Sequence, residues 1–364
     1  MNVTRTLPDF PWDSLAEAKA KAAEHPGGIV DLSIGTPVDP TPEPVQRALA
    51  EAANWPGYPT TAGTPELRRA QSDYLARRFG VAVEPTATLP VIGTKEVVAW
   101  LPTLIDLGPG DLVVGPSIAY PTYAVGAALA GTEYLATDDP AKALGAKLVW
   151  LNSPSNPTGR ISGADELTAW VRWAREHSAI LVADECYAEF GWDSDPLSIL
   201  SPEVSGGDHR GLLVLHSLSK RSNLAGYRAG FVAGDPELVA ELLAVRKHAG
   251  LIVPGPVQAA AVSALADQTH VEEQRRRYLA RRELLAPALE AAGFRIEHSE
   301  GSLYLWATQG ADSRDSVDFL AERGILVAPG DFYGDAESGA TRFVRVALTA
   351  TDERIAAATD RLRG

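Results

Sequence analysis

The 364-residue chain is poor in residues that form cross-links or bind metals. It contains one cysteine, Cys186, and seven histidines. A single cysteine cannot form a disulfide within the chain, and the lack of disulfides is typical of proteins in reducing compartments. The histidines follow no spacing that is typical of metal ligands, so we expect no bound metal. The composition therefore predicts a cytoplasmic protein.

The chain also lacks a surplus of positive charge and a long apolar run. It has 33 Lys and Arg residues against 47 Asp and Glu residues, a net charge of −14. An acidic surface repels a phosphate backbone, so we expect no nucleic-acid partner. The longest mostly apolar run, residues 252–266, is broken by proline and glycine and is shorter than the ~20 residues of a membrane helix. Residues 1–15 lack the features of a signal peptide, so we expect a soluble protein without a membrane partner.

Length and hydrophobic patterning indicate an α/β protein of about two domains at ~150 residues each. Short β-branched runs have the pattern of strands that are buried on both faces. These strands are expected at residues 111–114, 147–151, 180–183 and 212–215. A helical pattern at residues 165–177 lies between two of them, which indicates βαβ units with parallel strands. Helix starts, each with a cap residue followed by proline, are expected at residues 41–43, 64–66 and 235–237.

The pattern changes beyond Pro256 to long, charged helical stretches around short apolar runs. We therefore expect a mostly parallel sheet sandwiched by helices, with a smaller α+β domain packed on it. The expected division gives residues 1–34 to an N-terminal arm and part of the small domain. Residues 35–255 form the large domain, and residues 256–364 form the small C-terminal domain.

Polar segments follow three of the expected strands, at the edge where a parallel sheet binds ligands. They contain Asn156, then Asp184 and Tyr187, and then Lys220 with Arg228 beyond it. A lysine near a carboxylate, a phenol and an arginine suits a Schiff base with an anionic carbonyl cofactor. Pyridoxal 5′-phosphate needs an amine for its aldehyde, a carboxylate for its ring nitrogen, donors for its ring oxygen and a cationic phosphate cradle. The sequence therefore predicts a pyridoxal phosphate site.

These segments resemble the motifs of the class I and II aminotransferases, which have fold type I. The resemblance rests on Asn156-Pro-Thr-Gly159, Asp184-x-x-Tyr187 and Ser217-Leu-Ser-Lys220 with Arg228 eight residues on. Further matches cover most of the chain: Leu32-Ser-Ile-Gly35, Tyr58, Gly63, Leu67-Arg68, Gly93-Thr94, Tyr120 and Arg345. The resemblance implies a seven-stranded sheet, pyridoxal phosphate as cofactor, and a homodimer with shared active sites.

The resemblance also implies which residues act on the cofactor ring. Lys220 would form the Schiff base and then move the proton from the substrate Cα. Asp184 would pair with the pyridinium nitrogen, while Tyr187 and Asn156 would hydrogen-bond the ring oxygen. Lys220, Asp184 and Tyr187 are therefore the expected catalytic residues.

The phosphate and the faces of the ring would be held by a second group of residues. Ser217 and Arg228 would bind the phosphate, which suits a hydroxyl and a guanidinium. The other expected cofactor contacts are Gly93, Thr94 and Lys95 at a helix start, Tyr120 stacked on the ring with Tyr123 as its rival, and Tyr58 of the neighbouring subunit.

The substrate would be bound by Arg345, whose planar guanidinium suits the α-carboxylate, together with Gly35 and Asn156. Two residues beside the site have a structural interpretation. His216 is expected to be a structural residue at a strand end, and Cys186 a small buried packing residue.

Longer segments resemble the succinyldiaminopimelate aminotransferases, at residues 7–12, 30–39, 57–63, 89–96, 246–250 and 328–333. That family moves an amino group between glutamate and N-succinyl-2-amino-6-oxopimelate in lysine and diaminopimelate biosynthesis. The alternative is another class I/II aminotransferase, acting on aspartate or on an aromatic or neutral amino acid. Pyridoxal phosphate β-lyases and decarboxylases share the same cofactor motifs. A serine acyl-enzyme, suggested by Ser217-x-x-Lys220, lacks its S-D-N and K-T-G partner motifs here.

A long dianionic substrate needs a second cation in addition to Arg345. Because the chain is acidic overall, we expect a local basic patch beside the cofactor. The candidates are Lys95, Arg221, Arg246 and Lys247, which the sequence does not rank.

Overall fold

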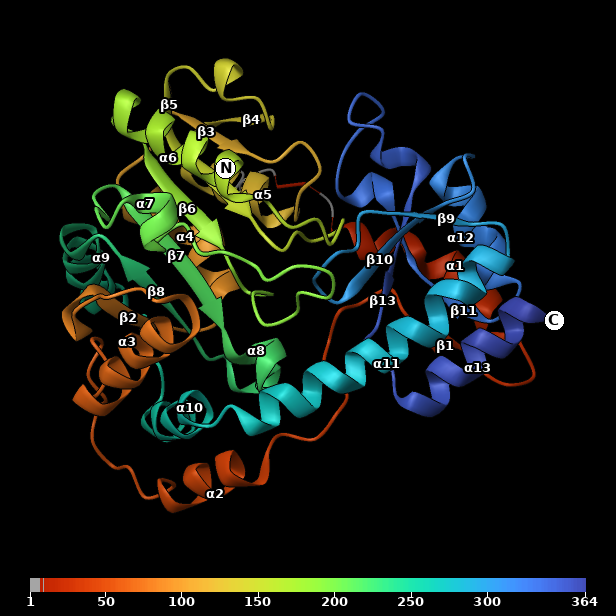
Figure 1. Cartoon of the computed structure of the whole chain (residues 1–364), viewed down its shortest axis with the longest axis horizontal. Helices are drawn as coiled ribbons and strands as arrows, with labels where there is room; N and C mark the ends of the chain where they lie inside the picture. Colours follow the sequence, from red (N-terminus) through yellow and green to blue (C-terminus); the bar gives the residue numbers. More distant parts are fainter. Residues whose placement is uncertain (1–6, 9) are drawn as a thin grey trace, which may run out of the picture.

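A seven-stranded sheet forms the centre of the large domain, on the left of Figure 1. The computed structural model describes residues 7–8 and 10–364. The strand order is β2-β8-β7-β6-β5-β3-β4; β8 is antiparallel to both of its neighbours, and all other neighbouring pairs are parallel. The strands are β2 (Thr88–Val91), β3 (Leu112–Gly115), β4 (Glu133–Ala136), β5 (Ala146–Asn152), β6 (Ile180–Asp184), β7 (Leu212–Ser217) and β8 (Gly230–Gly234). The predicted α/β class with a mainly parallel sheet is confirmed.

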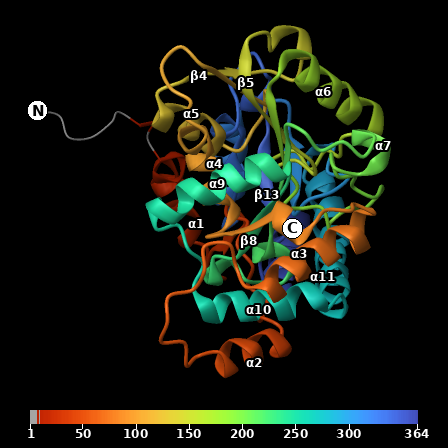
Figure 2. The same cartoon turned by 90° about the vertical axis from the view of Figure 1, so that its left-hand side faces the viewer.

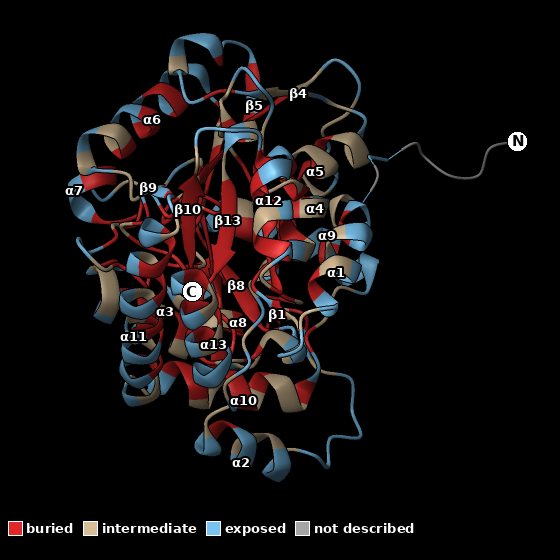
Figure 3. Ribbon diagram, turned by 90° about the vertical axis from the view of Figure 1, so that its right-hand side faces the viewer, coloured by how far each residue is buried: buried red, intermediate tan, exposed pale blue. Residues whose placement is uncertain are grey.

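Helices cover both faces of this sheet, because alternate residues of each strand point to opposite sides. Leu181 and Ala183 of β6 face one apolar cluster, whereas Val182 faces the other. The first face is covered by α3 (Pro65–Phe79), α6 (Ala164–His177), α7 (Pro202–Ser205) and α10 (Gly255–Ala266). The second is covered by α4 (Thr94–Leu104), α5 (Thr122–Ala130) and α9 (Pro236–Ala249). In Figure 3 the strands of this sheet other than the edge strand β4 are accordingly mostly buried, while the outer faces of the helices are exposed.

The small domain lies on the right of Figure 1 and combines both ends of the chain. Its antiparallel sheet has the order β12-β13-β10-β9, and β1 pairs in parallel with β11 beside it. The strands are β1 (Val30–Asp31), β9 (Arg295–Glu297), β10 (Tyr304–Thr308), β11 (Ile325–Leu326), β12 (Ala328–Pro329) and β13 (Val344–Ala347). The helices are α1 (Ala16–Ala23), α12 (Ser313–Ala321) and α13 (Asp352–Arg363).

The long helix α11 (Thr269–Ala291) connects the two domains. It begins beside α8 (Leu218–Arg221) of the large domain and packs along α13 of the small domain. The predicted domain boundary at residues 255 and 256 stays a proposal. Immediately after it, α10 packs on α2 (Glu43–Glu51) and α3 in the core of the large domain, so a division near Thr269 agrees better with the packing. The predicted N-terminal arm lies partly outside the described residues.

The helix starts show how far local sequence controls the structure. Thr64 and Asp235 cap α3 and α9 as predicted: Thr64 accepts a hydrogen bond from Leu67 N, and Asp235 accepts from Glu237 N and Leu238 N. The prediction for α2 was wrong by one residue. Pro42 is its cap, and the Thr41 hydroxyl donates instead to the Asn223 carbonyl at 3.2 Å. Figure 2 shows α2 below α10 at the margin of the large domain.

Among the residues that the structure describes, no helix has both the length and the apolar composition needed to cross a bilayer.

Candidate active site

A cavity of about 330 Å³ lies at the carboxyl ends of the parallel strands, between the two domains. It brings together eleven of the predicted site residues: Gly35, Thr94, Lys95, Tyr120, Asn156, Asp184, Tyr187, Ser217, Lys220, Arg228 and Arg345. Gly93 lies against the Arg228 side chain that lines this cavity. Tyr58 does not reach the cavity of its own chain, and its side chain is 99% exposed.

The alternation of β6 and β7 explains why Asp184 and Ser217 meet in this cavity. Asp184 has the same orientation as Val182, and Ser217 the same as Leu215, so both point to the side of α4 and α5. Glu185, directly after β6, and His216, one residue before Ser217 in β7, point to the opposite side. There the His216 Nε2 atom lies 3.2 Å from Glu185 Oε2, and its ring packs among aromatic side chains. His216 is thus buried behind the site, as expected of a structural residue.

Lys220 lies on the one-turn helix α8, directly after β7. Its Nζ atom donates a hydrogen bond to the carbonyl oxygen of Gly35. The pKa of Lys220 is lowered from 10.5 to about 8, mainly by burial, and the positive charges of Arg345 and Arg228 contribute to this lowering. An amine with this pKa is partly neutral near pH 7, and only the neutral amine is a nucleophile.

Asp184 is a buried carboxyl group with two hydrogen-bond donors. The Tyr123 hydroxyl donates to Oδ2 at 3.0 Å, and the backbone N–H of Cys186 donates to Oδ1 at 3.2 Å. Burial raises the pKa of Asp184, and no cation of the described residues lies within ion-pair distance. Tyr123 therefore holds the carboxylate and does not line the cavity, whereas Tyr120 does. The sequence analysis considered Tyr123 only as an alternative to Tyr120 for stacking on the cofactor ring, and did not predict its contact with Asp184.

Backbone geometry at the start of α4 forms an anion cradle. Gly93 caps the helix with φ of 72°, and a methyl group there would overlap the Arg228 guanidinium. The first N–H groups of α4, at Thr94 and Lys95, are free of intrahelical partners and favour a negative charge. Ser217 lies opposite, where its hydroxyl accepts a hydrogen bond from Ser219 N at 3.1 Å. These groups are suited to binding a phosphate.

Arg345 on β13 presents a buried cation to the cavity, with a side chain that is 2% exposed. Its guanidinium donates to Asn156 Oδ1 at 2.9 Å and to the Ser33 carbonyl at 2.6 Å. Both acceptors are neutral, and among the described residues Arg345 forms no ion pair, while its Nε has no partner. A buried cation of this kind is suited to binding a carboxylate.

Several cavity residues were missed by the sequence analysis: Phe10, Trp12, Ile34, Val98, Asn152, Ser219 and Tyr304. Asn152 had a signal, since it ends β5 and its side chain accepts from Asn156 N at 2.7 Å. Trp12 lies in the segment 7–12 that resembles the family, although nothing there assigned it to the site, and Tyr304 had no signal. Cys186 corrects an expectation, because it lines the cavity and its Sγ lies 3.1 Å from the Thr94 hydroxyl, rather than only filling the core.

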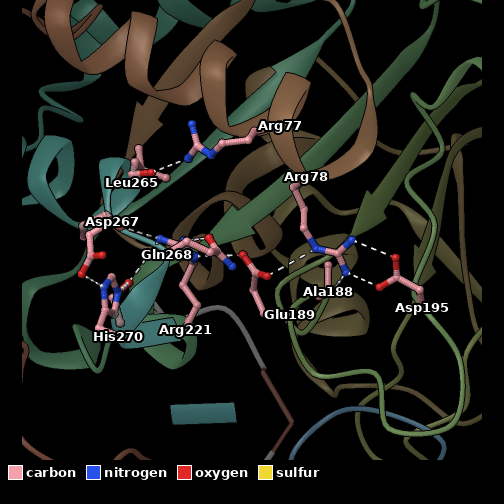
Figure 4. A network of polar contacts seen from close by, with 12 residues as sticks. Arg77, Arg78, Ala188, Glu189, Asp195, Arg221, Leu265, Asp267, Gln268 and His270 are labelled. Atoms are coloured by element: carbon pink, nitrogen blue, oxygen red, sulfur yellow. Dashed lines mark hydrogen bonds and ion pairs between the residues drawn. The ribbon is translucent and has the colours of Figure 1, made fainter. Parts of the chain in front are cut away.

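Of the four residues predicted to form a basic patch beside the cofactor, only one lines the cavity. Arg221 is 2% exposed and its Nε lies 3.1 Å from Glu189, which Arg78 contacts from the other side (Figure 4). Arg246 is 1% exposed and binds Glu96 at 2.7 Å. Both expectations were wrong because these charges are buried and neutralised within the protein. Lys247 is exposed but does not line the cavity, which leaves Lys95.

The residues present fit pyridoxal phosphate. The cavity volume is within the range of small-molecule sites. Asp184 lacks the cationic partner that a pyridinium N–H would supply, and the close approach of Gly93 to Arg228 leaves no room for a side chain at the cradle. Lys220 offers the amine that the aldehyde requires.

Comparisons with known proteins show which family the chain is similar to. The family model described as aminotransferase class I and II matches residues 28–362. A probable aminotransferase of Mycobacterium tuberculosis is 60% identical over 364 residues, covering 99% of this chain and 86% of that protein. The 4-dedimethylamino-4-oxo-anhydrotetracycline transaminase OxyQ of Streptomyces rimosus is 57% identical over 361 residues, covering 98% and 99%.

A solved structure, a probable N-succinyldiaminopimelate aminotransferase of Thermus thermophilus, superposes with a TM-score of 0.87 at 31% identity. The match covers 97% of this chain and 99% of that one. The fold and the dependence on pyridoxal phosphate that the sequence predicted are thus confirmed at the level of the family.

Proposed function

The chain belongs to the class I and II aminotransferases, and from that premise we propose that it moves an amino group between glutamate and N-succinyl-2-amino-6-oxopimelate. The product would be N-succinyl-LL-2,6-diaminopimelate, made in two half-reactions in one cavity. The observation that carries the proposal is a buried cation, Arg345, without an ion-pair partner in the described chain, in the same cavity as the amine of Lys220. A cytoplasmic location and a role in lysine biosynthesis belong to this proposal.

Lys220 holds the cofactor and transfers the proton at the substrate Cα. When bound, pyridoxal phosphate supplies an electron-accepting ring that stabilises the charge left at Cα. Asp184 would keep the ring nitrogen protonated, and the hydrogen bond from the Tyr123 hydroxyl orients the Asp184 carboxylate. The lowered pKa of Lys220 lets this amine accept a proton and release it near neutral pH.

The remaining cofactor contacts come from three sides. Tyr187 and Asn156 bind the ring oxygen, and Tyr120 stacks on the ring. Ser217, Arg228 and the start of α4 at Gly93, Thr94 and Lys95 bind the phosphate. Tyr58 is supplied by a second subunit, so the working enzyme is a homodimer; its full exposure in one chain agrees with a contact outside that chain.

Arg345 binds the α-carboxylate of both substrates, with Gly35 and Asn156 beside it. Lys95 and Arg228 are both exposed cations on the cavity wall; because Arg228 is assigned to the phosphate, we assign the Lys95 side chain to the distal end of the longer substrate. The similarity to the solved Thermus thermophilus structure, named as a probable N-succinyldiaminopimelate aminotransferase, supports the proposed substrate. The similarity to OxyQ favours a second candidate, a larger cyclic ketone as amino acceptor.

The test is an assay of the purified enzyme with glutamate and a panel of oxo compounds: N-succinyl-2-amino-6-oxopimelate, oxaloacetate, phenylpyruvate and a polycyclic ketone. The succinylated compound should have the highest kcat/KM. Lys95→Met should raise its KM up to about fivefold and leave the KM for glutamate within about twofold, because a partly exposed ion pair contributes at most ~1 kcal/mol.

Lys247→Met removes a lysine that does not line the cavity and is the matched control. Efficient turnover of oxaloacetate, phenylpyruvate or the polycyclic ketone, without turnover of the succinylated compound, would replace the proposed substrate but not the family.

A further inference from the structure

Tyr304, at the start of β10, contacts three of the groups that we assign to the reaction. It belongs to the small domain, is 3% exposed and lines the active cavity. Its hydroxyl lies 2.9 Å from the hydroxyl of Tyr187, which follows β6 in the large domain. The two rings meet edge to face with centroids 5.6 Å apart.

The ring of Tyr304 supports Arg345. The guanidinium carbon lies 4.1 Å from the ring centroid, which is the closest of its three aromatic neighbours; Tyr333 and Trp12 lie at 5.0 and 6.0 Å. A cation over an aromatic face is stabilised by the ring quadrupole. Gly35 lies against the same hydroxyl, since a methyl group there would overlap it.

We propose that Tyr304 is a positioning residue of this active site. Its hydroxyl donates a hydrogen bond to Tyr187, and its ring face contacts the guanidinium of Arg345. This inference rests on the proposed function. A tyrosine hydroxyl has one hydrogen to donate. If Tyr304 donates to the Tyr187 oxygen, the hydrogen of Tyr187 is left for the ring oxygen of the cofactor.

The direction of this hydrogen bond has a chemical consequence. Hydrogen bonds in a chain polarise one another, so donation from Tyr304 makes Tyr187 a stronger donor. A stronger donor would stabilise an anionic ring oxygen of the cofactor, which would lower the proton affinity of Lys220 Nζ while that atom is bonded to the cofactor. Burial raises the pKa of Tyr187, so its hydroxyl stays protonated through the working range of pH.

Tyr304→Phe in the cofactor-loaded enzyme tests the hydrogen bond, because it removes one oxygen and keeps the ring under Arg345. The readout is the pH midpoint of the visible absorbance of the cofactor bound to Lys220. We expect this midpoint to rise by about 0.5 pH unit, and kcat to fall about threefold with KM within about twofold. Tyr304→Leu also removes the ring that contacts Arg345, so the KM for glutamate and the KM for N-succinyl-2-amino-6-oxopimelate should each rise about tenfold.

Two further variants separate positioning from simple packing. Tyr278→Phe is the matched control, because Tyr278 is fully buried on α11, lies outside the cavity and has a hydroxyl without a hydrogen-bond partner in the described chain. It should leave the midpoint unchanged. In a Tyr187→Phe background, adding Tyr304→Phe should produce no further shift.

An unchanged midpoint in Tyr304→Phe, or an equal shift with and without Tyr187, would overturn the proposal. The absorbance needs only the cofactor, so a wrong substrate assignment would leave this test intact. Loss of the visible band in the wild-type enzyme would instead overturn the proposed cofactor site.

Discussion

Lys220 carries an amine whose charge changes close to neutral pH. Its pKa is lowered to about 8, so the neutral form dominates above that pH and falls about tenfold for each unit below it. The rate at which the apoprotein captures pyridoxal phosphate should therefore rise with pH up to about 8 and then level off. The measurement is absorbance after rapid mixing.

A free lysine derivative, with its ordinary pKa, is the comparison, and its rate should keep rising to pH 10. A capture rate of the protein that also rose to pH 10 would contradict the lowered pKa. Borohydride reduction followed by peptide mapping should place the label on Lys220, and a label on another of the seven lysines would contradict the site assignment.

Asp184 is the carboxylate whose negative charge matters most to the proposed chemistry. Asp184→Asn keeps the shape of the side chain but removes the charge that holds a proton on the ring nitrogen. A buried charge-assisted hydrogen bond is worth ~1.5–3 kcal/mol, and each ~1.4 kcal/mol of barrier is a factor of ten in rate. We expect kcat at saturating cofactor to fall at least tenfold. If the variant had a kcat near that of the wild type, Asp184 would have only a structural role in the turn after β6.

The start of α4 depends on the backbone of Gly93. Gly93→Ala places a methyl group in the Arg228 guanidinium, on a backbone that only glycine adopts readily. Displacing one charge-assisted phosphate contact should weaken cofactor binding about tenfold in Kd.

Gly80→Ala, at the end of α3, is the control, because Gly80 also has a positive φ but no neighbouring atoms within 4 Å. It should lower the free energy of unfolding by ~1 kcal/mol and leave the cofactor Kd unchanged. If the two variants had the same cofactor Kd, Gly93 would affect only the backbone conformation at the start of α4 and not the binding of the phosphate.

Local patterns predicted the central parallel strands β3, β5, β6 and β7 of the large sheet and missed β2, β4 and β8. The runs that became β5, β6 and β7 are mostly apolar; Asp184 ends β6, and Lys220 follows β7 on the one-turn helix α8. By contrast β4 is a partly exposed edge strand, and β2 contains Pro90, so neither has a clear pattern.

Contacts between distant segments could not be predicted from local sequence. Tyr304 enters the site from the small domain, and the contact between its hydroxyl and that of Tyr187 spans 117 residues. Arg221 and Arg246 looked like free cations, because a sequence does not show that Glu189 and Glu96 neutralise them in the core.

Two subunits should share each active site if Tyr58 acts across the dimer. Lys220→Ala homodimers should be inactive, and Tyr58→Ala homodimers should bind cofactor weakly. In a hybrid of the two, one site has both defects and the other has none. Co-expression should therefore restore about a quarter of wild-type activity at limiting cofactor. If activity does not exceed that of the separate variants, Tyr58 acts within one chain or not at all.

The pairing of β1 with β11 has a consequence for synthesis of the chain. Val30 pairs with Ile325, so the ribosome makes the second strand about 300 residues after the first. At ~5–20 residues per second, the delay is roughly 15–60 s. The sheet of the large domain is complete well before that time, since β8 ends at Gly234. The N-terminal segment therefore lacks its pairing strand β11 while the large domain folds, and the small domain completes its fold last.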